Sequence, residues 1–323
     1  MVVKTSLRKN IEYQMGKGKI ISEIIDRVEK YASINKPLLI EGATGTGKEL
    51  IVDYICRLNA QKKIAVNCGA VSKELVNSEL FGSVKGAFTG SQDMKGKVEA
   101  VDGGILFLDE FNSLPLNVQV NLLRLIENNI FTRVGDTVER KANVRIIAAS
   151  NKPCAELVKK GELRQDLYER FVKTIYIPTL KERSEDIDCF IDRFISEENK
   201  TLDKNVSISN EARNLLTGHD WPGNIRQLKN VITTLVIEVD INKQSKEYVI
   251  QPQLVRECLN ERYHNTTINI SEGDFTLQTA CDNAAKEAII RALDKTGGNN
   301  DQTIKLLNIS RGTYYSLKKR LGI

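Results

Sequence analysis

The chain has 323 residues, of which 41% are hydrophobic and 28% are charged, and its formal net charge is +5. These values are typical of a soluble protein with two or three globular domains. No apolar run approaches the roughly 18 residues that a membrane span needs, and the basic start of the sequence lacks the apolar stretch of a secretory signal. We therefore expect a cytoplasmic protein without a membrane partner.

Cysteine and histidine usage argues against a metal site built from their side chains. The six cysteines form no CxxC pair, and the chain has only two histidines. Scattered cysteines of this kind are typical of reduced, buried thiols in a cytoplasmic protein.

Short apolar runs alternate with helical patterns through residues 1–180. Alternation of this kind predicts an α/β domain, in which helices cover both faces of a parallel sheet. The expected elements are an amphipathic helix at 20–31 and buried strands at 37–41, 63–67, 104–109, 144–149 and 173–177.

The pattern becomes helical after residue 180. Residues 181–262 are expected to form a helical lid, and the polar segment 263–274 is expected to be a linker. Residues 275–323 return to a helical pattern and carry eight Lys and Arg against four Asp and Glu. A small basic module after a nearly neutral body indicates a nucleic-acid partner.

The first predicted strand leads into a glycine-rich sequence and then a helix, as a phosphate-binding loop requires. Glycines allow successive backbone N–H groups to converge on phosphate oxygens, and the helix start adds partial positive charge. A lysine at the end of the loop supplies a full charge to the β- and γ-phosphates of ATP. The residues expected to bind the nucleotide are Gly42, Ala43, Thr44, Gly45, Thr46, Gly47, Lys48 and Glu49.

Many such loops place Ser or Thr after the lysine to contact Mg²⁺, whereas this chain has Glu49. Magnesium must then be held through phosphates, waters and a carboxylate from another segment. Strand 104–109 ends in Asp109, followed by Glu110, and a parallel sheet brings such residues to the edge where the phosphate-binding loop lies. We expect Asp109 to coordinate Mg²⁺ and Glu110 to polarise the attacking water.

These segments and several others resemble, in one order and at matching spacing, the motifs of the sigma-54-dependent activators, also called bacterial enhancer-binding proteins. The segments are GATGTGKE, VNC, SELFG, GAFTGS, GGILFLDEF, RVGD, AASN, LRQDLYER and WPGNIRQLKN. The resemblance covers residues 11–245 and implies a AAA+ P-loop NTPase fold. It also implies a homo-oligomeric ring, usually a hexamer, with ATP and Mg²⁺ bound between neighbouring subunits.

The resemblance implies roles for further polar residues. Arg164 and Arg170 match arginine fingers, which offset charge on the phosphoryl group in the neighbouring subunit's site. Asn151 matches a sensor beside the γ-phosphate, and Arg226 matches a lid arginine that contacts the nucleotide. Asn67 matches an asparagine that holds the catalytic glutamate; its alternative role is to cap the end of a strand.

A glycine-bounded loop is the most diagnostic of the matching segments. In the family this loop projects from the ring and contacts sigma-54, with Phe88 and Thr89 in direct contact. The family's usual sixth residue is Ala, and this chain has Ser91. The loop residues are Gly86, Ala87, Phe88, Thr89, Gly90 and Ser91.

The last 49 residues also resemble the small DNA-binding domain usually found at the end of this family. Apolar residues at helical spacing predict a first helix to about residue 296, Asn299 and Asn300 can cap a second, and Ser310 a third. These dimensions fit a helix-turn-helix, whose second helix enters the major groove of double-stranded DNA, and dimers of such modules bind a palindromic site. The expected DNA-binding residues are Ser310, Arg311, Thr313, Tyr315, Lys318, Lys319 and Arg320.

The function expected from the resemblance is ATP-dependent transcription activation. The activator binds an upstream DNA site and hydrolyses ATP to remodel closed complexes of sigma-54 RNA polymerase holoenzyme into open ones. About 35 residues before the ATPase domain are too few for a regulatory domain, so we expect control by a separate protein, unless the chain is a fragment. The alternatives are a DNA-binding AAA+ regulator that no longer acts on sigma-54, with Ser91 as its sequence support, and a AAA+ machine of general specificity.

Overall fold

The computed structural model describes residues 2–88, 90–239 and 248–263, together with parts of 285–307 and residues 309–321. It divides into two compact units, residues 1–260 and 261–323. Within the described part, no helix is long and apolar enough to cross a membrane. Most of the predicted linker, residues 264–274, lies outside the described residues.

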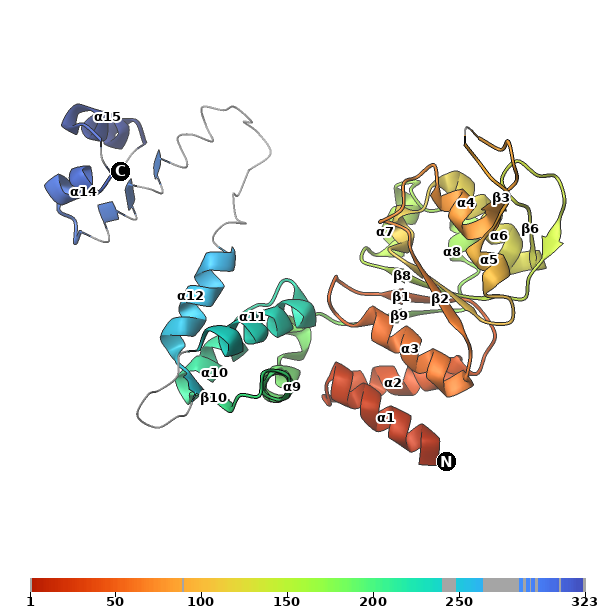
Figure 1. Cartoon of the computed structure of the whole chain (residues 1–323), viewed down its shortest axis with the longest axis horizontal. Helices are drawn as coiled ribbons and strands as arrows, with labels where there is room; N and C mark the ends of the chain where they lie inside the picture. Colours follow the sequence, from red (N-terminus) through yellow and green to blue (C-terminus); the bar gives the residue numbers. More distant parts are fainter. Residues whose placement is uncertain are drawn as a thin grey trace. The chain divides into compact units, whose positions relative to one another are not determined.

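Five parallel strands form the central sheet of the first unit (Figure 1). Their order across the sheet is β2-β5-β8-β1-β9, and every neighbouring pair is parallel. The predicted parallel α/β sheet is therefore confirmed. The strands are β1 (Leu38–Glu41), β2 (Lys63–Asn67), β5 (Ile105–Asp109), β8 (Arg145–Ser150) and β9 (Lys173–Tyr176).

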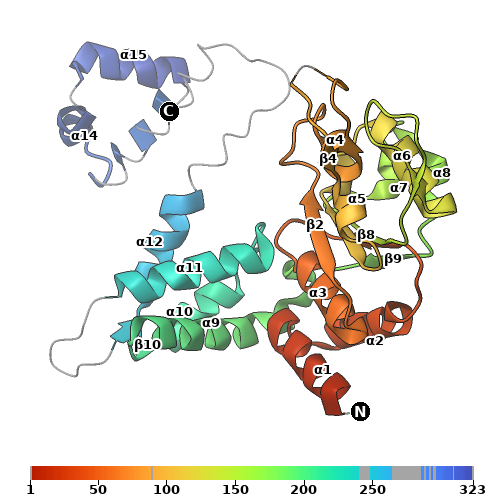
Figure 2. The same cartoon turned by 45° about the vertical axis from the view of Figure 1, so that its right-hand side comes forward.

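Two hydrophobic cores form because alternate side chains of a strand point to opposite faces of the sheet. On β5, Leu106 and Leu108 pack in one core, whereas Ile105 and Phe107 pack in the other. Helices cover both faces, as Figures 1 and 2 show. One face carries α4 (Val76–Phe81), α5 (Lys97–Ala100), α6 (Leu116–Asn128), α7 (Cys154–Lys159) and α8 (Gln165–Tyr168); the other carries α1 (Val2–Met15), α2 (Lys19–Ala32) and α3 (Lys48–Asn59).

Helix α1 was not predicted from the sequence. Its periodic pattern is weak. Among residues 4–15, whose side chains the structure describes, Ile11 and Met15 are the deeply buried ones, and they join the core formed with α2 and α3. The helix is held by this tertiary contact rather than by local propensity.

Two antiparallel hairpins extend from the α/β domain. The first pairs β3 (Gly82–Ser83) with β4 (Met94–Lys95), and the second pairs β6 (Ile130–Phe131) with β7 (Arg140–Lys141). The two segments meet at Val134. Its carbonyl oxygen accepts a hydrogen bond from Val84 N, and its N–H group donates to Gly82 O.

The lid follows the sheet. A parallel pair of short strands lies among its helices, and this pair was missed because each strand has only three residues. The lid elements are the 3-10 helix η2 (Lys181–Asp186), α9 (Ile187–Leu202), β10 (Val206–Ile208), α10 (Asn210–Thr217), α11 (Asn224–Glu238), β11 (Tyr248–Ile250) and α12 (Pro252–Tyr263).

In the C-terminal unit, α14 (Asn300–Leu307) and α15 (Arg311–Leu321) agree with the predicted second and third helices. Asn299 Oδ1 accepts hydrogen bonds from the backbone of Asp301 and Gln302, and Ser310 Oγ accepts one from Thr313 N, so both predicted caps are confirmed. Most of the predicted first helix lies outside the described residues.

A buried arginine joins the sheet to α2. Arg145, at the start of β8, is only 4% exposed, and its guanidinium donates to the backbone oxygens of Tyr31, Ala32 and Lys36. The carbonyls of Tyr31 and Ala32 lie at the C-terminal end of α2, where a positive charge is favourable. Burial lowers the pKa of this guanidinium.

We expect Arg145→Met to lower the free energy of unfolding by about 2–3 kcal/mol, because three carbonyl groups lose a charged donor. Urea denaturation followed by circular dichroism measures this change. The control is Arg27→Met, since Arg27 is exposed and forms only a 3.9 Å ion pair with Glu23 on the same helix. Equal stability of the two variants would contradict this account of Arg145.

Candidate functional site

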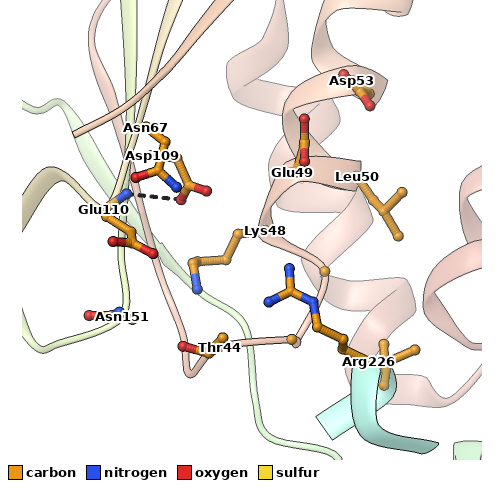
Figure 3. A pocket seen from close by; sticks show the side chains of 13 residues that line it. Thr44, Lys48, Glu49, Leu50, Asp53, Asn67, Asp109, Glu110, Asn151 and Arg226 are labelled. Carbon is orange, nitrogen blue, oxygen red and sulfur yellow. Dashed lines mark hydrogen bonds between the residues drawn. The ribbon is translucent and has the colours of Figure 1, made fainter. Parts of the chain in front are cut away.

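A cleft with a volume of about 540 Å³ lies at the carboxyl ends of the sheet strands, beside the start of α11. The predicted phosphate-binding loop, acidic pair and lid arginine all reach it (Figure 3). The residues that line it are Thr44, Gly45, Gly47, Lys48, Glu49, Leu50, Asp53, Asn67, Asp109, Glu110, Asn151, Ile225 and Arg226.

The glycine-rich loop connects β1 to α3, and α3 begins at Lys48. Gly45 and Gly47 have φ angles of +79° and +102°, which favour glycine. Lys48 Nζ donates to the carbonyls of Gly42 (2.7 Å) and Ala43 (3.0 Å). Burial lowers the pKa of Lys48, and the charge of Asp109 opposes this shift. The ammonium group therefore sits in the loop, where phosphate oxygens can replace the two carbonyls.

Asp109 ends β5, and Glu110 follows it with a φ angle of +49°. With this left-handed backbone, the carboxylates of Asp109 and Glu110 point in different directions (Figure 3). Asp109 Oδ1 accepts a hydrogen bond of 2.9 Å from Glu110 N. Lys48 lies between this acidic pair and Arg226 (Figure 3). The cleft thus places two carboxylates beside the phosphate-binding loop: that of Asp109, which is suited to Mg²⁺, and that of Glu110. Within the described chain, no group of three or more His, Cys, Asp or Glu side chains is arranged to hold a metal without the phosphates.

Gly69 is a site residue that the sequence reasoning missed. A Cβ atom at this position would lie 1.9 Å from Glu110 Oε2, so any residue other than glycine would displace the carboxylate from this position. The available signal was the glycine two residues after Asn67 in the segment VNCG.

Asn67 caps the end of β2. Its Oδ1 accepts hydrogen bonds from Gly69 N (2.9 Å) and Ala70 N (3.0 Å). This geometry is the strand-end cap considered as an alternative role. The side chain also lines the cleft together with Glu110.

Asn151 follows β8 and lines the same cleft. Its backbone N–H donates to Asn112 Oδ1, which also accepts from Ser150 Oγ. Asn112 was not predicted, and it fixes the end of β8 relative to the segment after Glu110.

Lid residues bind the backbone of the phosphate-binding loop. Asn224 Nδ2 donates to Thr44 O (2.9 Å), and Ile225 N donates to Gly45 O (3.1 Å). Arg226, next along α11, lines the cleft from the lid side. The lid helix therefore places Arg226 at the nucleotide position through direct contact with the loop.

Arg183 and Asp186 in η2 form a second buried connection that was not predicted. Arg183 donates to Met15 O (2.6 Å) and Thr46 O (2.9 Å) and is 1% exposed. Asp186 accepts from the backbone of Lys17 and Gly18. Burial lowers the pKa of Arg183 to about 10 and raises that of Asp186.

Arg164 and Arg170 lie outside the cleft. Arg164 forms a two-pronged ion pair with Asp166, and Arg170 pairs with Glu127. Their side chains are 40% and 48% exposed. Neither arginine is brought to the nucleotide cleft of its own chain.

The glycine-bounded loop extends from the β3–β4 hairpin, and Thr89 lies outside the described residues. Phe88 is 41% exposed. Ser91 Oγ accepts from Phe88 N (3.1 Å) and donates to Val84 O (3.3 Å), so its hydroxyl joins the two sides of the loop base. A Cβ on Gly135 would lie 2.5 Å from Ala87 Cβ, so this loop packs closely on the segment after β6.

The predicted DNA-binding residues of the C-terminal unit lie on or just before α15. Lys318 is half-buried, with Nζ 5.7 Å from the centre of the Tyr314 ring, and Arg311 forms an ion pair with Asp301. The remaining predicted residues are exposed: Ser310, Thr313, Tyr315, Lys319 and Arg320.

Comparison with known proteins gives two matching family models. Residues 14–177 match the sigma-54 interaction domain, and residues 181–267 match the AAA+ ATPase lid domain.

Curated relatives match almost the whole chain. The phenol regulator MopR of Acinetobacter guillouiae is 36% identical over 331 residues, covering 97% of this chain and 59% of MopR. The nitrogen fixation protein AnfA of Azotobacter vinelandii is 36% identical over 315 residues, covering 96% of this chain and 57% of AnfA. The chain therefore spans less than two thirds of the length of these relatives.

The crystal structure of NtrX from Brucella abortus in complex with ATP has a TM-score of 0.71 and 26% sequence identity, covering 95% of this chain and 69% of that one. This likeness agrees with the AAA+ fold of the sheet and lid. Since the sigma-54 interaction domain matches half of the chain and the lid model follows it, this chain belongs to the AAA+ family of sigma-54-interacting transcriptional regulators.

Proposed function

We propose that this chain is an ATP-hydrolysing transcription activator that remodels closed complexes of sigma-54 RNA polymerase holoenzyme into open complexes. The observation that carries the proposal is the pairing, in one α/β domain, of the cleft that contains Lys48, Asp109 and Glu110 with the Phe88 loop. The match to the sigma-54 interaction domain supports the choice of partner.

The cleft residues support ATP hydrolysis. Lys48 and the backbone N–H groups of its loop bind the phosphates, and Arg226 binds the nucleotide from the lid. Asp109 is placed to hold Mg²⁺ together with the phosphates, and bound Mg²⁺ supplies positive charge to the phosphate oxygens. Glu110 orients and polarises the attacking water.

Exposed arginines outside the cleft support a ring of subunits. Arg164 and Arg170 each pair with a carboxylate of their own chain and do not line their own cleft. In a homo-oligomeric ring, most simply a hexamer, a neighbour's guanidinium groups complete each site and stabilise the transferring phosphoryl group. Asn151 then acts as the sensor of the γ-phosphate, and Asn67 restrains Glu110.

The C-terminal unit is proposed to bind DNA as a helix-turn-helix. Helix α15 presents exposed polar and basic residues, and its first turn carries Arg311 and Thr313. Arginine at this position can donate two hydrogen bonds to guanine, while Lys319 and Arg320 suit phosphate contacts. The Arg311–Asp301 ion pair is exposed, so it opens at little cost when DNA is bound.

We expect Lys48→Ala to weaken ATP binding roughly 100-fold, because the phosphates lose charged hydrogen bonds. Titration with a fluorescent ATP analogue measures this affinity. The control Lys30→Ala removes an exposed lysine of α2 and is expected to bind as the unaltered protein does. Unchanged affinity of Lys48→Ala would refute the assigned phosphate contact.

Glu110→Gln is expected to bind ATP normally and to hydrolyse it roughly 10²–10⁴ times more slowly, because the amide cannot act as a base. Single-turnover release of phosphate measures the chemical step. Glu74→Gln, an exposed acid far from the strand end, is the matched control. Normal turnover by Glu110→Gln would remove this residue from the mechanism.

The direct test of the proposed function is open-complex formation on a sigma-54 promoter. We expect opening that requires hydrolysable ATP. Phe88→Ala is expected to lose opening while its ATPase rate stays within about twofold, since the loop lies away from the cleft. The control Leu202→Ala changes a lid residue that is 38% exposed, close to the 41% of Phe88.

Intact ATPase and DNA binding without any opening would favour the alternative, a DNA-binding AAA+ regulator that does not act on sigma-54. Ser91→Ala would then be the first variant to test for restored opening.

A further inference from the structure

A groove of about 550 Å³ lies beside the Phe88 loop, and the nucleotide chemistry does not use it. One wall is the start of α4, at Leu75 and Glu79. The other is the β3–β4 hairpin with the loop itself, at Phe88 and Met94. Lys97, at the start of α5, also lines the groove. The groove is therefore continuous with the surface proposed to contact sigma-54.

Large apolar side chains are exposed along this groove. Leu75 is 49% exposed, Met94 49% and Phe88 41%. Single exposed apolar residues are common on protein surfaces, but several around one hollow mark an interaction site. Methionine also adapts its shape to different apolar partners.

Closely packed backbone joins α4 to the hairpin that lines the groove. A Cβ on Gly96 would lie 2.4 Å from both Leu80 O and Gly82 N, so the hairpin approaches α4 as closely as backbone allows. Ser83 pairs with Met94 across the hairpin, and Ser83 Oγ donates to Gln92 O (2.9 Å). Met94 is thereby fixed to the base of the loop and moves with it.

The charges around the groove favour an apolar rather than a cationic segment. Asp93 is paired with Arg133, and Glu79 lies 3.9 Å from Lys97. Lys95 is exposed on the same hairpin. The acidic groups of the rim are thus offset by basic side chains, and a cationic segment gains nothing there.

We propose that the groove binds an apolar segment of sigma-54 beside the Phe88 contact, so that Leu75 and Met94 are specificity-determining residues. This inference rests on the proposed function. In this proposal, sigma-54 contacts both walls of the groove. Met94 and Phe88 belong to the hairpin and the loop that it carries, whereas Leu75 is the N-cap residue of α4, which is packed in the core of the domain.

The experiment measures binding of purified sigma-54 to the full chain loaded with ADP and aluminium fluoride, by fluorescence anisotropy. We expect the double variant Leu75→Gln/Met94→Gln to bind roughly tenfold more weakly, with unchanged ATPase rate and assembly. Met94→Leu keeps the apolar contact and should bind as the unaltered chain does. Ile237→Gln is the control, since Ile237 is 55% exposed on the lid helix α11.

Equal binding by the double variant and the Ile237→Gln control would overturn the groove assignment. Loss of assembly in the double variant would assign the groove to a second copy of this chain and would also overturn it. Absence of sigma-54 binding by the unaltered chain is a separate outcome, because it rejects the proposed function itself.

Discussion

The phosphate-binding loop must keep its N–H groups free for phosphate, and its carbonyl groups therefore need partners from elsewhere. Lys48 Nζ donates hydrogen bonds to the carbonyl oxygens of Gly42 and Ala43. The next three carbonyls, of Thr44, Gly45 and Thr46, accept from Asn224, Ile225 and Arg183 of the lid. Because backbone carbonyls without partners are costly, these contacts with the lid stabilise the shape of the loop. The position of Arg226 over the cleft follows from the same contacts.

The N-terminal helix is part of this arrangement. Arg183 joins Met15 O to Thr46 O, and Met15 Sδ occupies the space that a Cβ on Gly47 would need. Asp186 holds the backbone that connects α1 to α2. A displacement of α1 would therefore act on the loop and the lid at once, which makes the α1–α2 junction a mechanical part of the nucleotide site.

The sequence allowed prediction of the sheet and of the residues that chemistry places at strand ends. Lys48, Asp109 and Glu110 follow from a strand, a glycine turn and an acidic pair, all local features. Asn224 and Arg183 escaped prediction because their partners are backbone atoms 180 and 137 residues away. The role of Gly69 was not predicted because it depends on the Glu110 carboxylate, which lies against Gly69 only in the folded chain. Residues proposed to act on a neighbouring subunit or on DNA have their proposed targets outside this chain, so their roles stay predictions.

The Ser91 hydroxyl gives the sigma-54 loop a defined resting shape. By bridging Phe88 N and Val84 O, it removes conformations that an alanine would leave accessible. A loop that is already ordered loses less conformational entropy when it binds, so more of the contact energy appears as affinity. The same order raises the work that ATP hydrolysis must do to change the loop's shape. If the loop contacts sigma-54 as proposed, this one hydroxyl group would shift the balance between holding sigma-54 and releasing it.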